Sequence, residues 1–158
     1  MTGTGNRDSD DLPSEGTYTL VIGLEEPVEI RVGALGLRRF DAPAYCYTGS
    51  AFGTGGFSRV DRHRRLAAGE HDARHWHVDY LLGHPETRLA GVVKSHGAEA
   101  ECPIARRLGE GPIEGFGASD CDCRSHLVDR QNVREALAEA KAVHVEETDP
   151  AAVALETA

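Results

Sequence analysis

The sequence predicts a mixed α/β fold of the α+β kind, a small, mainly antiparallel three-stranded sheet flanked by helices. Apolar, β-branched segments alternate along the chain with segments of helical periodicity. Three strand-like segments near the N-terminus suggest the small antiparallel sheet. The length of 158 residues suits one domain with a real core and makes a second domain unlikely to fit.

The N-terminal third supplies the three strands. Residues 1–15 are polar and are expected to form a disordered tail. GTYTLVIGL at 16–24 has the pattern of a buried strand, and VEIRVG at 28–33 alternates as a half-exposed partner strand does. ALGLRRFD at 34–41 is expected as a turn with some structure, and AYCYTGS at 44–50 as the third strand.

The central part alternates helices and a strand. A glycine-rich turn precedes a helix predicted over 57–67. HWHVDYLL at 75–82 favours a second helix, and TRLAGVVKS at 87–95 is typical of a strand. AEAECPIARRL at 98–108 predicts a helix that Pro103 interrupts early.

The C-terminal part ends with one clear helix. GFGASDCDCRSHLV at 115–128 is expected as a glycine-led loop that enters a short strand, and NVREALAEAKAV at 132–143 as a helix. The last residues are acidic and alanine-rich. The sequence therefore predicts a single domain, 16–145, followed by a loose acidic tail, 146–158.

The charge composition is acidic. The chain has 26 acidic and 17 basic residues, a net charge of -9, and only two lysines. Acidic surfaces with arginine in place of lysine are typical of a high-salt cytoplasm, where screening reduces self-repulsion. No apolar leader or membrane-length run is present, so we expect a cytoplasmic protein without membrane partners and with reduced cysteines.

Cations gather at one strand-to-helix junction, YCYTGSAFGTGGFSRVDRHRR at 45–65. Tyr18 and Tyr47, on paired strands, would present phenolic oxygens at one edge of the sheet. Arg59 would add a forked, permanently charged donor suited to phosphate, and the glycines would let a bulky polyanion approach the backbone. This set can hold a phosphodiester, but it lacks a carboxylate for a metal ion.

Further residues of the junction are candidates for substrate contact. Arg59, Arg62 and His63 share one face of the predicted helix through their i, i+3 and i+4 spacing. A solvated helix face is the alternative interpretation of these cations. The residues expected to contact substrate are Gly49, Ser50, Arg62 and Arg65.

The junction is similar to a known enzyme superfamily. GTY at 16–18, YTG at 47–49 and Arg59 on the next helix resemble the GIY-YIG nucleases. The form YCYTGSAFGTGG, followed by HWHVDYLL and later GFGASDCDC, looks specifically like the DUF123 branch. That branch has no assigned activity and sometimes occurs fused to endonuclease III. The resemblance covers roughly residues 16–130.

The resemblance implies roles for five residues. Glu101, on a later helix, would bind one divalent ion, Mg²⁺ or Mn²⁺, and Arg59 would hold the scissile phosphate. Tyr18 would orient or deprotonate the attacking water, with Tyr47 beside it. His63 would assist proton transfer or contact the phosphate. Because an unperturbed tyrosine titrates at about pH 10, a role as base requires the ion or Arg59 to lower its pKa.

The sequence departs from the family pattern in three places. Residues 19–46 separate the motif tyrosines, more than in most members, which implies an inserted strand and loop. Thr17 and Thr48 replace motif residues at structural positions. The late asparagine of several members has no clear match in SDCDCRSH, where Ser119 and Asp120 either cap a turn or extend the site.

HWHVDYLL also permits a metal interpretation. His75, His77 and Asp79 would align on one face of a strand, whereas on a helix only His75 and Asp79 are neighbours. The favoured alternative packs Trp76 and Leu81 in the core, with the histidines hydrogen-bonded at its edge.

CDCRSH places Cys121, Cys123 and His126 in a C-x-C-x2-H arrangement. Zinc would need a fourth ligand, and the usual C-x2-C spacing is absent, so zinc is not expected. Cys102 is a further thiol that the sequence alone does not place near this group.

The function that these patterns favour is a metal-dependent nuclease-like domain that hydrolyses phosphodiester bonds in nucleic acid. DNA is favoured over RNA, with a role in DNA repair beside a repair-protein partner. The expected cofactor is one Mg²⁺ or Mn²⁺. The alternatives are a catalytically silent nucleic-acid-binding module and a small zinc-binding interaction domain built on Cys121, Cys123 and nearby histidines.

Overall fold

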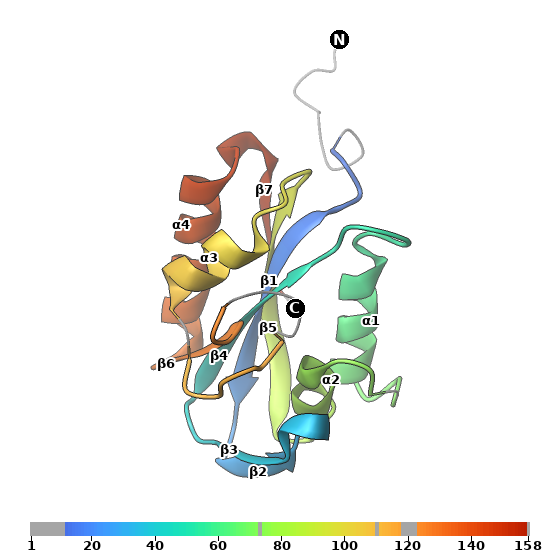
Figure 1. The fold of residues 1–158 in the computed structure, drawn as a ribbon, viewed down its shortest axis with the longest axis vertical. Coiled ribbons are helices and arrows are strands. Elements are labelled where there is room, and N and C mark those ends of the chain that lie inside the picture. The colour runs from blue at the N-terminus through green and yellow to red at the C-terminus, as the bar shows by residue number, and fades with distance from the viewer. Residues whose placement is uncertain (1–11, 73, 110, 118–122, 158) are drawn as a thin grey trace.

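A five-stranded antiparallel sheet forms the centre of the computed structural model, with β1 in its middle (Figure 1). The strand order is β6-β4-β1-β5-β7. The structure describes residues 12–72, 74–109, 111–117 and 123–157. The strands are β1 (Gly16–Leu24), β4 (Ala44–Ser50), β5 (Thr87–His96), β6 (Leu127–Arg130) and β7 (Val153–Thr157). The mixed, mainly antiparallel class is confirmed, but the sheet is larger than the predicted three strands.

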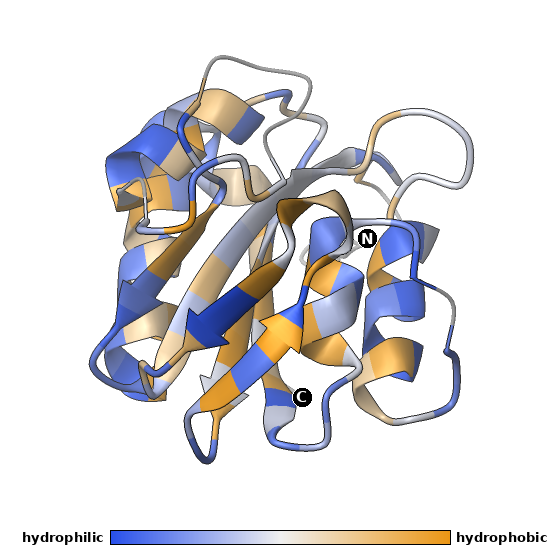
Figure 2. Cartoon of the chain, turned by 60° about the horizontal axis from the view of Figure 1, so that its bottom comes forward, coloured by the Kyte–Doolittle hydropathy of each residue, from blue (hydrophilic) through white to orange (hydrophobic). Residues whose placement is uncertain are grey.

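The second predicted strand lies outside this sheet. β2 (Val28–Arg31) pairs with β3 (Leu37–Phe40) in a separate two-stranded sheet, so the expectation that 28–33 joins the first strand is wrong. A 3-10 turn, Gly33–Leu35, joins the two strands. Hydrophobic and hydrophilic residues alternate along β2 (Figure 2), because one face packs on the core while the other meets solvent. This hairpin is the insertion expected between the two tyrosine motifs.

Helices cover both faces of the central sheet (Figure 1). α1 (Ser58–Ala67) and α2 (His77–Leu82) pack on one face, and α3 (Glu101–Leu108) and α4 (Val133–Glu147) pack on the other. Side chains of β1 alternate between the two cores, with Leu20 and Ile22 in the first and Val21 in the second. β1 is therefore buried on both sides along its whole length.

The predicted helices at 57–67, 75–82 and 132–143 correspond to α1, α2 and α4. The predicted interruption at Pro103 is wrong, since this residue lies in the first turn of α3. A residue in the first turn has no intrahelical acceptor for its N–H, so proline costs nothing there.

The expected loose tail at 146–158 is structured where it is described. α4 continues to Glu147, a 3-10 turn follows at Pro150–Ala152, and β7 pairs with β5. Glu156 on β7 accepts hydrogen bonds from Lys94 at 3.0 Å and from Arg64 at 2.5 Å. These pairs and the β-ladder hold the C-terminal strand on the sheet edge.

The N-terminal tail predicted at 1–15 is only partly described, since residues 1–11 lie outside the described residues. The segment that follows is hydrogen-bonded to the domain. The Phe57 amide donates to the Ser14 carbonyl at 2.8 Å, and the Gly97 amide donates to the Glu15 carbonyl at 2.7 Å. Across the described part of the chain, no helix is both long and apolar enough to cross a membrane.

Candidate functional site

One polar cavity of about 220 Å³ gathers most of the residues that the sequence singled out. It is built from β1, β4, α1, the approach to α2, the start of α3 and the loop before β6. Its lining residues are Tyr18, Tyr47, Ser50, Arg59, His75, Trp76, His77, Glu101 and Gly117. Two phenols, a guanidinium and a carboxylate from distant parts of the sequence therefore meet at one cavity.

Strand pairing explains how Tyr18 reaches this cavity. Tyr18 on β1 lies directly opposite Gly49 on β4. A Cβ atom at Gly49 would lie 2.6 Å from the Tyr18 hydroxyl oxygen, so only glycine leaves room for the ring. Gly49 thus contributes space for the phenol, and it is buried. The expected contact between Gly49 and substrate stays a prediction.

Tyr18 is hydrogen-bonded to a buried histidine. Its hydroxyl lies 2.9 Å from Nε2 of His63, and the donor depends on the histidine tautomer. Burial raises the pKa of Tyr18 well above its usual value, and the nearby Tyr47 adds to this effect. Burial also lowers the pKa of His63 to about 4, a shift that Asp79 opposes. Both groups are therefore neutral near pH 7.

The position of His63 differs from the expected one. The helical spacing placed it on an outer face with Arg59, but only about 1% of its side chain is exposed. It lies on the inward stripe of α1 with Val60 and Leu66. His63 does not line the cavity, and it is connected to the cavity by its hydrogen bond to the Tyr18 hydroxyl.

Tyr47 is the second buried phenol of the cavity. Burial raises its pKa strongly, with Glu101 and Asp79 adding to the rise and Arg59 opposing it. Gly117, which has φ +68°, packs on the ring, where a Cβ atom would lie 2.7 Å from Cε1 of Tyr47. The loop before β6 therefore closes over Tyr47.

Arg59 reaches the cavity from the first turn of α1. Its guanidinium donates to the Ser50 carbonyl at 2.5 Å and stacks on Trp76 with 5.0 Å to the ring centroid. Among the described residues, no carboxylate pairs with Arg59. Ser50 thus takes part through its carbonyl, which orients the cation. A guanidinium with unused donors in a cavity can bind an anion.

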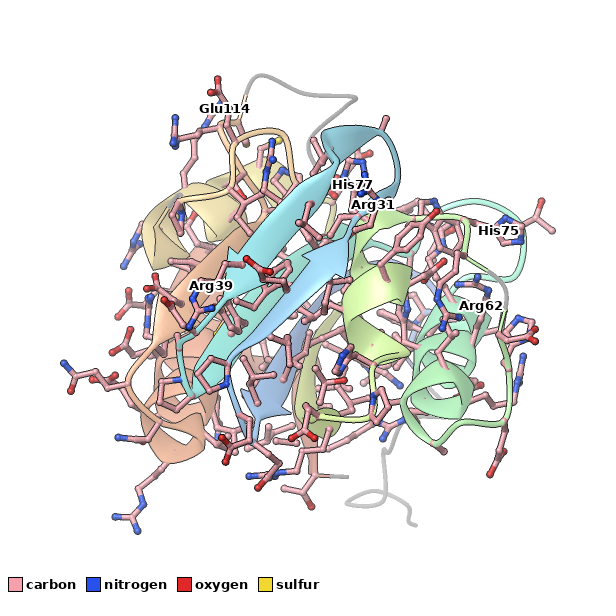
Figure 3. All side chains as sticks on the ribbon, turned by 90° about the horizontal axis from the view of Figure 1, so that it is seen from below. Arg31, Arg39, Arg62, His75, His77 and Glu114 are labelled. Atoms are coloured by element: carbon pink, nitrogen blue, oxygen red, sulfur yellow. The ribbon has the colours of Figure 1, made fainter. Side chains whose placement is uncertain are left out.

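Arg62 has a different role from the expected one. It donates two hydrogen bonds to the buried Asp79 carboxylate, at 3.0 and 2.9 Å. Its guanidinium also stacks on Trp76, the ring that Arg59 contacts, with 4.7 Å to the ring centroid. Figure 3 shows Arg62 and His75 on the side of the molecule that α1 and α2 form. Arg62 is therefore engaged in an ion pair with Asp79, and its contact with substrate stays a prediction.

Asp79 is also unsuited to the metal interpretation of HWHVDYLL. Its Oδ2 accepts from the His75 and Trp76 amides, at 2.7 and 2.9 Å, which fixes the start of α2. Burial opposes its charge, but the hydrogen bonds from Arg62 and the two amides lower its pKa overall. His77 accepts from the Gly117 amide at 2.8 Å through Nδ1. Asp79 thus serves α2, while His75 and His77 line the cavity.

Arg65 lies outside the cavity. It lines a neighbouring, more open hollow of about 310 Å³, which Arg59 and Trp76 connect to the cavity. The remaining lining residues of that hollow are Thr54, Ser58, Asp61 and Arg62. Arg65 is exposed there, and its contact with substrate stays a prediction.

Glu101 begins α3 at the cavity wall. Its Oε2 lies 3.1 Å from Nδ1 of His126, a buried residue directly before β6. The carboxylate is part-exposed, which leaves it accessible from the cavity. Carboxylate oxygen suits Mg²⁺ or Mn²⁺, which need few protein ligands when waters and substrate oxygens complete the shell. Glu101 therefore supplies one oxygen ligand of the type that such an ion prefers.

Behind Glu101 the structure brings three soft ligands together. The ligand atoms of Cys102, Cys123 and His126 all lie within 4.8 Å of one another, so this cluster can hold a metal ion. The sequence alone did not predict that Cys102 lies beside Cys123 and His126. Ser119, Asp120 and Cys121, predicted in the same region, lie outside the described residues.

Sequence reasoning missed two cavity residues. Trp76 was assigned to the core, but it is 39% exposed and stacks with both Arg59 and Arg62. The signal for it was an aromatic residue beside a helix rich in arginine, since guanidinium groups favour aromatic faces. Gly117 had no such signal, because its contact with Tyr47 depends on loop closure.

The fold and cavity define a class of protein: a mixed α/β domain whose central antiparallel strands present a polar cavity. The sequence matches the family described as domain of unknown function DUF123 over residues 17–148, and the chain belongs to that family. No curated protein and no solved structure matches the chain.

Proposed function

We propose that this domain is a metal-dependent nuclease of the GIY-YIG type, which hydrolyses phosphodiester bonds in nucleic acid. The observation that carries the proposal is the shared cavity of Tyr18, Tyr47, Arg59 and Glu101. The resemblance of the GTY, YTG and arginine motifs to those nucleases supports the same chemistry. DNA is the preferred substrate in this proposal, with repair as the setting.

Arg59 holds the phosphate in the proposed reaction. Its bond to the Ser50 carbonyl and its stacking on Trp76 fix the plane of the guanidinium before substrate arrives. The remaining N–H groups then bind phosphate oxygens and offset the charge that grows on them. Fixed donors of this kind cost no reorganisation during the reaction.

The two phenols position the attacking water. Because burial keeps both protonated, each acts as a hydrogen-bonding group in the free protein and not as a phenolate base. With His63 as acceptor, the Tyr18 hydroxyl passes its proton to Nε2, 2.9 Å away, as its oxygen takes one from water. Asp79, with Oδ1 4.0 Å from Nδ1 of His63, favours the cation that this transfer creates.

Glu101 holds the divalent ion in this proposal. Mg²⁺ or Mn²⁺ at its carboxylate would supply Lewis-acid stabilisation of the leaving oxygen. The chain contributes the carboxylate, and Nδ1 of His126 lies 3.1 Å from one of its oxygens. One protein carboxylate is within the usual range for such an ion when substrate phosphate is also bound.

A cleavage assay with a matched pair of variants tests the proposal. Nicked, branched and single-stranded DNA and RNA are incubated with wild type, Glu101→Gln and Glu99→Gln, with Mg²⁺ or Mn²⁺ and with chelator. We expect metal-dependent cleavage, a loss of about 100-fold or more in Glu101→Gln, and little change in Glu99→Gln. Glu99 is the control because it is exposed and does not line the cavity.

Two results would contradict the nuclease proposal. Equal cleavage by wild type and Glu101→Gln would remove Glu101 from the mechanism. Binding without cleavage of any substrate would instead favour the silent nucleic-acid-binding module.

A further inference from the structure

Three potential metal ligands from two segments, the start of α3 and the loop before β6, meet behind the cavity. Cys102 is the second residue of α3, Cys123 lies in the loop before β6, and His126 directly precedes β6. Sγ of Cys102 lies 4.0 Å from Nε2 of His126, and all three ligand atoms lie within 4.8 Å of one another.

The chemistry of this cluster selects zinc. Thiolate and imidazole are soft to borderline ligands, which favour Zn²⁺ over Mg²⁺ or Mn²⁺. Tetrahedral zinc, with bonds of about 2.0–2.3 Å, places neighbouring ligand atoms about 3.6–3.8 Å apart. The observed separations therefore need to contract by roughly 1 Å at most to bind the ion. Three protein ligands leave one tetrahedral position for water or another donor.

The cluster is held in place by the surrounding fold. Cys123 and His126 are buried. The His126 amide donates to the Phe116 carbonyl at 2.8 Å, and its carbonyl accepts from the Thr48 amide at 3.1 Å. The backbone of His126 is therefore fixed at both its amide and its carbonyl beside β4.

The other nitrogen of His126 lies close to the proposed catalytic carboxylate. Nδ1 lies 3.1 Å from Oε2 of Glu101, while Nε2 is the nitrogen on the Cys102 side. A metal at Nε2 leaves the proton on Nδ1, which then donates to the carboxylate. Histidines that bind zinc commonly donate their other ring N–H to a carboxylate in this way.

We infer that Cys102, Cys123 and His126 form a zinc site that positions Glu101 at the cavity. The zinc would tie the start of α3 to the loop before β6, and the His126 Nδ1–H would hold one oxygen of Glu101. The zinc site stands on the cluster alone. Its effect on catalysis rests on the proposed function.

Metal analysis tests the site directly. Untagged protein is dialysed against metal-free buffer, and its zinc content is measured by mass spectrometry. We expect about one zinc per chain in wild type and a loss of at least ~10-fold in Cys102→Ala and Cys123→Ala. Cys46→Ala is the matched control, because Cys46 is a buried cysteine that lies away from the cluster, in the core between β4 and α4. It should keep its zinc.

Cobalt substitution of wild type gives a second measurement that does not depend on variants folding. We expect thiolate-to-cobalt charge-transfer bands in wild type and in Cys46→Ala. The inference is overturned if wild type takes up neither zinc nor cobalt, or if both cysteine variants keep full metal content. An intact mass that shows a Cys102–Cys123 disulfide in the purified wild type would also overturn it.

The zinc site and the nuclease are separable in these experiments. Glu101→Gln should retain its zinc while it loses cleavage. If zinc depends on Cys102 and Cys123 but no protein cleaves nucleic acid, the zinc site stands and the nuclease proposal fails. If wild type cleaves at full rate with no zinc bound, the nuclease proposal stands and the zinc inference fails.

Discussion

At the scale of single residues, protonation decides what the cavity can do. Tyr18 and Tyr47 lie beside a cation, which would favour phenolate, but burial outweighs Arg59 at both positions. The sequence suggested a tyrosine base activated by Arg59 or a metal. The structure instead has neutral phenols, one of them bonded to a neutral imidazole. Proton transfer through Tyr18 to His63 is consistent with both protonation states.

Alkaline titration checks these protonation states. Burial raises the pKa of Tyr18, Tyr45 and Tyr47, which are three of the four tyrosines. We therefore expect phenolate absorbance from these three only at a pH where circular dichroism shows unfolding. Ionisation of all three at about pH 10, with the fold intact, would contradict this account and would restore Tyr18 as a direct base.

At the scale of elements, α2 depends on a contact that connects it to α1. The six residues of α2 are too few to be stable alone. Asp79 closes its first turn through two backbone amides and pairs with Arg62 from α1. The same ion pair sets the position of Trp76, which stacks on Arg59 in the cavity.

Asp79→Asn should therefore destabilise the domain. The substitution removes the charge that compensates Arg62 and weakens the cap of α2, and we expect the free energy of unfolding to fall by about 2–4 kcal/mol. Urea denaturation measures this, with Asp129→Asn, an exposed residue on β6, as the control. A change below about 1 kcal/mol at Asp79 would show that the pair does not support α2.

Much of the element pattern could be predicted from the sequence, because strong local signals agreed with the fold. The strand at 16–24 and the helices at 57–67 and 132–143 have such signals. The pairing of VEIRVG could not be predicted, since its alternation fits any sheet with one buried face. β7 was missed because its stability comes from the β5 edge and from the ion pairs of Glu156.

The candidate site could likewise be predicted only in part from the sequence. Tyr18, Tyr47, Arg59 and Glu101 were named from motifs, and the structure brings them to one cavity. The ion pair of Arg62 and the burial of His63 depend on how α1 packs against α2 and β1, which no local pattern reveals. Cys102 and His126 meet only when α3 reaches β6.

At the scale of the whole molecule, buried histidines connect stability to pH. His144 on α4 bonds the hydroxyls of Thr19 at 2.8 Å and Ser95 at 2.7 Å, which ties α4 to β1 and β5. Burial lowers the pKa of His144 to about 4, and it lowers the pKa of His63 to about 4 as well. In the unfolded chain both would titrate at about pH 6.5.

Stability should therefore fall as the pH drops. A histidine with a lowered folded-state pKa contributes its full stability above pH 6.5, and loses it as the unfolded state takes up protons between pH 6.5 and about 4. Each contributes a slope of about 1.4 kcal/mol per pH unit in this window. Urea denaturation from pH 7.5 to 4.5 gives the free energy of unfolding as a function of pH. The slope of this dependence should be smaller in His144→Gln than in wild type, by the equivalent of about one proton. An unchanged slope would mean that His144 is not buried in its neutral form.

Because the protein has a net charge of -9, the cations at the cavity contrast with the charge of the molecule as a whole. On an acidic protein, a cation without a carboxylate partner is a local point of attraction for a polyanion. Arg59 occupies this point at the cavity, and Arg65 extends it over the neighbouring hollow. For the proposed nuclease, recognition of nucleic acid would thus be local and sensitive to salt.

The cleavage rate of Arg59→Ala compared with Arg106→Ala tests the central claim most directly. Both substitutions remove one arginine from a helix, but Arg106 is exposed on α3 and lies outside the cavity. We expect Mg²⁺-dependent cleavage to fall about 100- to 1,000-fold in Arg59→Ala and to stay near the wild-type rate in Arg106→Ala. Equal rates for the two variants would contradict a phosphate site between Arg59 and the tyrosines.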